Sequence, residues 1–146
     1  MESPSRDTAK RAAKILIVED DPGVSYAVSR WMQEQNVKSV IAESTQEALD
    51  MLRDVVFIEA TFDGLLVDYN LPDATGMRVI QEFRDEFPNM PVALMTGNVN
   101  IYMELWLRAR KIPLFRKPLE LVSLQAWVEA LKPATVKASS PPPATT

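Results

Sequence analysis

The sequence of 146 residues contains no cysteine and no histidine. Without cysteine there can be no disulfide, no thiolate nucleophile and no zinc–thiolate site. Without histidine there can be no serine–histidine triad, no imidazole metal ligand and no phosphohistidine carried by this chain itself. The reactive groups that remain are mainly carboxylates, hydroxyls and amines.

Long apolar segments are also missing. No apolar run approaches the roughly 20 residues that span a bilayer, and residues 1–14 are charged without the apolar centre of a secretory signal. The net charge of −4 argues weakly against nucleic acid or an anionic membrane as a partner. We therefore expect a cytoplasmic protein that binds neither nucleic acid nor membrane.

Composition predicts one folded domain between two tails. The 47% of apolar residues and 25% of charged residues are ordinary for a globular protein. Residues 1–13 are polar and predict a flexible tail, whereas 14–132 carry the periodic apolar pattern. In residues 133–146, Lys, Ala, Ser, Thr and Pro dominate, a composition that buries too little apolar surface to offset its ordering entropy. That segment is predicted to be disordered.

Short apolar runs that stop at polar residues recur along the domain, and they predict strands buried on both faces. The predicted strands are 14–18, 37–42, 65–68, 92–96 and 114–116. Helical spacing predicts helices at about 22–35, after Ser44, and at about 76–87, 98–110 and 119–131. This alternation indicates an α/β fold, a doubly wound (βα)5 parallel sheet of flavodoxin-like order 2-1-3-4-5.

Several residues carry local predictions. Asp21 is a candidate cap for the first helix, which Pro22 would open, and Ser44 with Glu47 fits a capping box. The helix at 98–110 has more apolar residues than one buried face needs. Its Trp106 or Tyr102 most simply covers the sheet; the alternative is a partner-docking face shared with strand 114–116 and helix 119–131.

Polar side chains stand at the ends of four predicted strands: Glu19 and Asp20, Asp68, Thr96, and Lys117. Carboxyl ends of parallel strands meet at one edge of a sheet, where open α/β folds bind ligands. Neighbouring carboxylates repel unless a cation lies between them, and oxygen ligands suit Mg²⁺. A hydroxyl and an ammonium can hold phosphoryl oxygens, and a carboxylate can accept a phosphoryl group. The strand ends therefore predict phosphoryl transfer centred on Asp68.

These strand ends resemble the receiver domains of two-component response regulators. The resemblance covers about 14–131 and is carried by VEDD at 18–21, VDYNLPDATGM at 67–77, MTG at 95–97 and RKP at 116–118. It implies that Asp68 accepts a phosphoryl group from a sensor histidine kinase or a histidine phosphotransfer protein. It also implies that Thr96 and Lys117 hold the phosphoryl oxygens, that Lys117–Pro118 is a cis peptide, and that Gly97 keeps the space beside Thr96 small.

The resemblance further implies the ligands of a magnesium ion. Asp20 and Asp68 would bind Mg²⁺ directly, Asn70 through its backbone carbonyl and Glu19 through water. The protein would catalyse its own aspartyl phosphorylation and dephosphorylation while serving mainly as a switch. It would signal through a downstream protein target or a phosphorelay.

The sequence departs from the family where Leu114 replaces a frequent aromatic residue and Arg110-Lys111 replaces a frequent Gly-Ala pair. Two alternatives to a phosphorylation-activated regulator remain open. The protein could be a phosphorylation-independent interaction module, or the receiver part of a hybrid histidine kinase. An aspartyl phosphatase of the haloacid dehalogenase type needs Asp-x-Asp after the first strand, whereas Asp20 precedes Asp21 and Pro22. A flavin-binding variant would need a Ser/Thr/Gly-rich loop there, which this sequence lacks.

Overall fold

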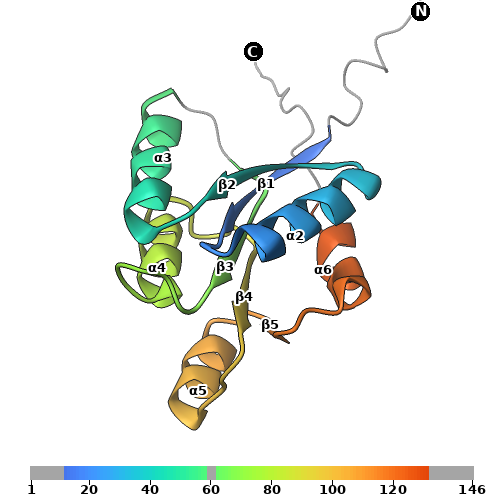
Figure 1. The fold of residues 1–146 in the computed structure, drawn as a ribbon. Coiled ribbons are helices and arrows are strands. Elements are labelled where there is room, and N and C mark those ends of the chain that lie inside the picture. The colour runs from blue at the N-terminus through green and yellow to red at the C-terminus, as the bar shows by residue number, and fades with distance from the viewer. Residues whose placement is uncertain (1–11, 59–61, 132–146) are drawn as a thin grey trace, which may run out of the picture.

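A computed structural model describes residues 12–58 and 62–131 (Figure 1). Five parallel strands form one sheet in the order β2-β1-β3-β4-β5, as predicted. They are β1 (Ala13–Val18), β2 (Val37–Ala42), β3 (Gly64–Asp68), β4 (Val92–Thr96) and β5 (Leu114–Arg116). The predicted tails lie outside the described residues except for Ala12 and Ala13, and Ala13 already belongs to β1.

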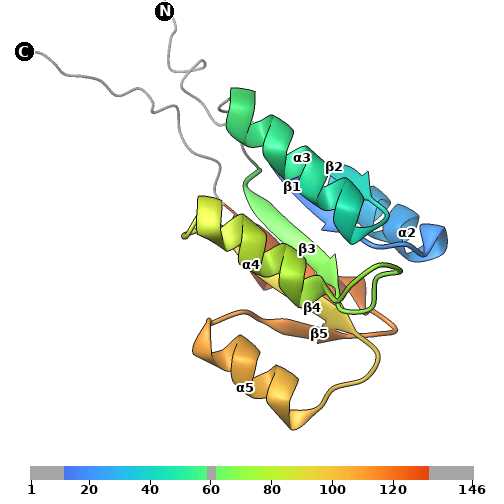
Figure 2. The same ribbon diagram turned by 90° about the vertical axis from the view of Figure 1, so that its left-hand side faces the viewer.

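Helices cover both faces of the sheet (Figures 1 and 2). They are α2 (Pro22–Glu34), α3 (Thr45–Ile58), α4 (Gly76–Glu86), α5 (Ile101–Ala109), the 3₁₀ turn η1 (Leu121–Leu124) and α6 (Gln125–Glu129). Buried residues of α3, α4 and α5 join one apolar cluster, and those of α2, η1 and α6 join another. Within 12–58 and 62–131, every helix is too short or too polar to cross a membrane.

The central strands are apolar on both sides because each side meets a helical layer. In β3, Leu65 and Val67 enter the cluster with α3 and α4, whereas Leu66 between them enters the cluster with α2 and α6. All five residues of β3 are buried, and so are all five of β4. Each large aliphatic side chain so buried stabilises the fold by roughly 1.5–3 kcal/mol.

Two helices differ from their predicted extents. Helix α5 begins at Ile101 instead of residue 98, because the Asn100 side chain accepts a hydrogen bond of 2.9 Å from the Met103 amide and caps the helix there. The predicted helix at 119–131 is a 3₁₀ turn followed by a short α-helix. The Ser123 hydroxyl donates to the Glu120 carbonyl (2.6 Å), a local bond that favours the tighter turn.

Trp106 is half-buried and packs against the apolar cluster beneath α5. The Arg110 guanidinium lies over its ring, 4.1 Å from the centroid. The exposed apolar side chains of this helix are instead Ile101, Leu105 and Tyr102, the last with 82% of its surface exposed. This placement favours the interpretation that Trp106 covers the core, whereas the same expectation for Tyr102 is wrong because its side chain lies in solvent.

The backbone is left-handed two residues after helix α5 ends. Lys111 has φ of 58°, its amide donates to the Arg108 carbonyl (3.1 Å), and the Ile112 amide donates to the Leu107 carbonyl (3.0 Å). These two bonds form the Schellman termination, in which glycine usually holds the left-handed position. A lysine side chain is disfavoured in the left-handed region, so Lys111 carries a conformational cost.

Lys111→Gly should therefore raise the free energy of unfolding by about 1 kcal/mol, the left-handed penalty less the greater unfolded-state entropy of glycine. Urea denaturation of the two proteins measures the difference. Asn36→Gly is the matched control, because Asn36 has φ of 63° after α2 and asparagine tolerates this region better than lysine. An equal gain at both positions, or a loss at Lys111, would contradict this explanation.

Candidate functional site

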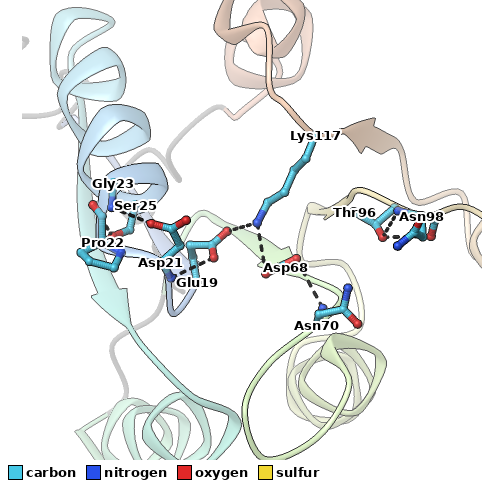
Figure 3. Close-up of polar contacts among 10 residues, drawn as sticks. All are labelled: Glu19, Asp21, Pro22, Gly23, Ser25, Asp68, Asn70, Thr96, Asn98 and Lys117. Carbon is cyan, nitrogen blue, oxygen red and sulfur yellow. Dashed lines mark hydrogen bonds and ion pairs between the residues drawn. The ribbon is translucent and has the colours of Figure 1, made fainter.

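The candidate site lies at the carboxyl edge of the sheet, where β1, β3 and β5 bring their terminal side chains together (Figure 3). Val18 lies beside Val67 in the register of β1 and β3, so Glu19 follows at the level of Asp68. The Lys117 ammonium reaches both acids, 2.6 Å from Glu19 Oε1 and 3.1 Å from Asp68 Oδ2. The structure thus joins three of the predicted residues directly.

Burial of this ion-pair network affects the pKa values of Glu19 and Lys117. Glu19 and Asp68 are 1% and 4% exposed, and the Lys117 side chain is 21% exposed. Burial raises the pKa of Glu19, although the hydrogen bond from Lys117 opposes the shift. Burial also works against the charged form of Lys117, but the hydrogen bond to Glu19 and the charge of Asp68 outweigh it and raise the pKa of Lys117. The lysine therefore stays protonated between the two acids.

In the turn after β1, the neighbouring acids Asp20 and Asp21 have different roles. The Asp21 side chain accepts from the Gly23 amide (2.9 Å) and caps α2, with Pro22 at the first helical position. The Asp21 amide donates to Glu19 Oε2 (3.0 Å) and fixes that carboxylate. Asp21 is therefore a helix cap, and Asp20 is the exposed acid of the site.

The residues fit a magnesium ion. One carboxylate oxygen each from Glu19, Asp20 and Asp68 lies within 4.8 Å of the other two. Three carboxylates against the single Lys117 ammonium leave the cluster negatively charged, and Mg²⁺ prefers oxygen ligands while keeping several waters. The exposed Asp20 leaves the cluster open to solvent. A hydrated divalent cation therefore suits both the charge and the donor set.

Thr96 is the predicted site residue that the structure does not bring to Asp68. It ends β4 and is fully buried, but its hydroxyl donates to the Asn98 carbonyl (3.0 Å) and accepts from the Asn98 amide (3.2 Å). Figure 3 shows both residues turned away from the Asp68–Lys117 pair. A local turn thus holds the hydroxyl that was predicted to contact phosphate.

Asn70 lies in the loop after β3, and its amide donates to Asp68 Oδ1 (3.3 Å). The Lys117–Pro118 peptide is cis, as the resemblance implied. A Cβ added to Gly97 would meet no atom of the described residues within 4 Å apart from its chain neighbours, Thr96 and Asn98, so no remote contact requires glycine there. Leu114 packs toward the helices α3 to α5, whereas Phe115 packs on the opposite face. Phe115 therefore does not replace the family's aromatic residue.

Gly76 and Asp73, in the segment that follows Asp68, have tertiary roles that their sequence pattern did not suggest. A Cβ on Gly76 would lie 2.3 Å from the Asp68 carbonyl oxygen, so only glycine fits where α4 starts. Asp73, predicted as a turn residue, accepts hydrogen bonds from the amides of Thr45 (2.8 Å) and Gln46 (2.9 Å) in the first turn of α3. Neither contact has a local signal, because Gly76 lies eight residues after Asp68 and Asp73 lies 28 residues after Thr45.

The hydrogen bonds at Asp73 predict a pH effect. The amides of Gln46 and Thr45 lower the pKa of Asp73 below its ordinary value near 3.8. A lowered folded-state pKa means that the stabilisation is present above pH 3.8 and is lost as the pH falls through the folded-state value. The stability difference between wild type and Asp73→Asn, measured by denaturation, should shrink below that pH. A constant difference from neutral to acidic pH would contradict it.

Comparison with known proteins agrees with this geometry. The family model of the response regulator receiver domain matches residues 15–129. The response regulator protein PilR of Pseudomonas aeruginosa is 27% identical over 117 residues, which are 79% of this chain and 25% of PilR. The aerobic respiration control sensor protein ArcB of Escherichia coli is 30% identical over 122 residues, 81% of this chain and 15% of ArcB. The chain thus spans a quarter or less of these relatives.

Solved structures show the same fold. A CheY-like receiver domain protein from Methanospirillum hungatei superposes with a TM-score of 0.72 at 20% identity, covering 81% of this chain and 91% of that one. Chemotaxis response regulator CheY4 of Vibrio cholerae gives a TM-score of 0.69 at 22% identity, covering 82% and 98%. The family match extends over nearly all the strands and helices described above. The chain therefore belongs to the response regulator receiver domain family.

Proposed function

We propose that this protein is a phosphorylation-activated receiver whose phosphoacceptor is Asp68. One observation carries the proposal: the Asp68 carboxylate is buried at the carboxyl edge of the sheet and paired with Lys117 (3.1 Å), within reach of two further acids. The donor would be a phosphohistidine of a sensor kinase or of a phosphotransfer protein. The 146 residues contain no histidine, so the donor imidazole would lie outside this sequence.

The proposed transfer forms one bond and breaks one. An Asp68 carboxylate oxygen attacks phosphorus, the phosphorus–nitrogen bond of phosphohistidine breaks, and the imidazole leaves with its electron pair and takes a proton from solvent. The product is an acyl phosphate. Water attack on that phosphorus would later return inorganic phosphate and the free carboxylate. The protein thus acts on itself and serves mainly as a switch.

The side chains around Asp68 would each stabilise part of the negative charge on the phosphoryl oxygens. Lys117 already lies beside Asp68 Oδ2 and would hold one oxygen. Asp20, Asp68 and the Asn70 carbonyl would hold Mg²⁺ directly, and Glu19 would hold it through water. When bound, the metal supplies charge neutralisation at the phosphoryl oxygens. Thr96 would hold a further oxygen only after its hydroxyl leaves Asn98.

That last requirement gives a test of the switch. Adding Mg²⁺ and beryllofluoride, a stable mimic of the acyl phosphate, should shift the Asn98 amide signal in an NMR spectrum, because its hydrogen bond to Thr96 breaks. The Val40 amide in β2, remote from the site, serves as the internal reference. An Asn98 signal that does not move would contradict the proposal and favour a phosphorylation-independent module.

A hybrid kinase is a second candidate for the context of this domain. The match to ArcB, a sensor protein, covers 81% of this chain. In either context we propose a cytoplasmic location and output through a downstream protein target or a phosphorelay, without nucleic acid or membrane contacts. Phosphotransfer from a purified partner kinase would identify the donor.

A further inference from the structure

We propose that Asp73 is a positioning residue for the phosphorylation site. By holding the first turn of α3, its carboxylate would fix the loop 69–75 and with it Asn70. The inference rests on the proposed function, because it concerns the loop that presents the Asn70 carbonyl to Mg²⁺. The carboxylates that cluster at the candidate metal site are those of Glu19, Asp20 and Asp68, and Asp73 is not among them.

The two ends of this loop are fixed at Asp68. The Gly76 amide donates to the Tyr69 carbonyl (2.8 Å), and Asn70 and Thr75 form an isolated β-bridge. The Asn70 amide also contacts Asp68 Oδ1. These bonds close the base of the loop, and none of them reaches its tip, residues 71–74.

The tip is held by Asp73. Its Oδ1 accepts from the Thr45 amide (2.8 Å) and its Oδ2 from the Gln46 amide (2.9 Å). Two oxygens on two adjacent donors fix orientation as well as distance, and a negative charge at a helix N-terminus is favourable. Leu71 adds a half-buried apolar contact beside it, which is less directional than hydrogen bonds.

The first turn of α3 depends on the same contact. The Glu47 amide donates to Ser44 Oγ (3.1 Å), and the first bond within the helix runs from the Ala48 amide to the Ser44 carbonyl (3.1 Å). The Glu47 carboxylate accepts from the Glu43 amide (2.6 Å), not from Ser44 as a capping box predicts. Asp73 therefore satisfies the two remaining amides of the turn, and α3 and the loop fix each other.

This mutual contact makes the coupling reciprocal. If Asp73 orients the loop toward Mg²⁺, then Mg²⁺ binding must in turn strengthen the hold on Thr45 and Gln46. Hydrogen exchange of those two amides should slow when Mg²⁺ is added. The same measurement on Ala48, whose amide bonds within the helix, should change less.

A four-protein comparison tests the inference: wild type, Asp73→Ala, Thr45→Pro and the double variant, each titrated with Mg²⁺ by calorimetry. Proline is tolerated at the first helical position and removes one donor without changing the charge. Asp73→Ala should raise the Mg²⁺ dissociation constant about fivefold, and Thr45→Pro about twofold. Once Asp73 is absent, Thr45→Pro should have no further effect.

The outcomes separate this inference from the proposed function. Unchanged affinity in Asp73→Ala, or effects of the two changes that multiply, would overturn the positioning role alone. The Asn70 amide signal in the metal-free protein should also shift in Thr45→Pro, and a fixed signal would overturn the role equally. Wild type that binds no Mg²⁺, with an Asn70 signal that still responds to Thr45→Pro, would overturn the proposed function and leave the loop contact supported.

Discussion

Replacing Gly76 by alanine should destabilise the protein by about 3 kcal/mol or more, the upper range for overpacking a filled site. The added Cβ would lie 2.3 Å from the Asp68 carbonyl oxygen and 2.7 Å from Val67 Cγ1. The carbonyl belongs to a buried central strand and cannot move without disturbing the sheet. Alanine otherwise favours helices over glycine, so a loss of stability would identify the close contact as its cause.

Urea denaturation of Gly76→Ala measures this effect, and Gly97→Ala is the matched control. Apart from its chain neighbours, a Cβ at Gly97 meets no atom of the described residues within 4 Å, so the stability of Gly97→Ala should change by less than about 0.5 kcal/mol. Amide signals of Asp68 and its neighbours should shift in Gly76→Ala only. Equal stabilities of the two variants would show that α4 can move away from β3, contrary to the close packing described.

Replacing Lys117 by methionine should lower the free energy of unfolding by about 2–3 kcal/mol in the presence of a chelator. The change leaves Glu19 and Asp68 buried without the ammonium that lies 2.6 Å and 3.1 Å from them. Removing one partner of a buried pair costs about 3–5 kcal/mol, and the partial exposure of Lys117 reduces that figure. Methionine keeps most of the apolar stem, so the effect reports on charge.

A double-mutant cycle with Asp68→Asn isolates the cause. In the Asp68→Asn background one of the two buried carboxylates is already replaced by a neutral amide. Lys117→Met should therefore lower the free energy of unfolding clearly less in that background. Thermal or urea denaturation of the four proteins gives the interaction energy. Strictly additive losses would mean that Lys117 stabilises the fold through its stem and not through the acids.

The sequence predicted the sheet well because its strands are short apolar runs with polar ends. The runs at Val92–Thr96 and Leu114–Arg116 match their strands residue for residue. The same strand ends predicted the cluster of Glu19, Asp68 and Lys117, because carboxyl ends of parallel strands meet at one edge. Parallel register places the ends of neighbouring strands side by side. The predicted strand order was therefore enough to predict that these residues meet.

Other features depend on contacts between remote segments. The hold of Asp73 on Thr45 and the close approach of Gly76 to Asp68 involve positions that no local pattern relates. The Thr96 hydroxyl could bond either to a phosphoryl group at Asp68 or to Asn98, and in this structure it bonds to Asn98. Ser123 similarly tightened a helix that apolar spacing alone predicted as regular. Side-chain orientation and loop contacts were therefore beyond sequence reasoning.

The central claim is that Asp68 is the phosphoacceptor, and intact-mass spectrometry tests it most directly. Wild type, Asp68→Asn and Asp73→Asn are each incubated with acetyl phosphate and Mg²⁺. Wild type should gain one phosphoryl group, mapped to Asp68; Asp73→Asn should still gain it, although more slowly, and Asp68→Asn should gain none. An unmodified wild type, or an Asp68→Asn protein modified to the same extent, would contradict the account.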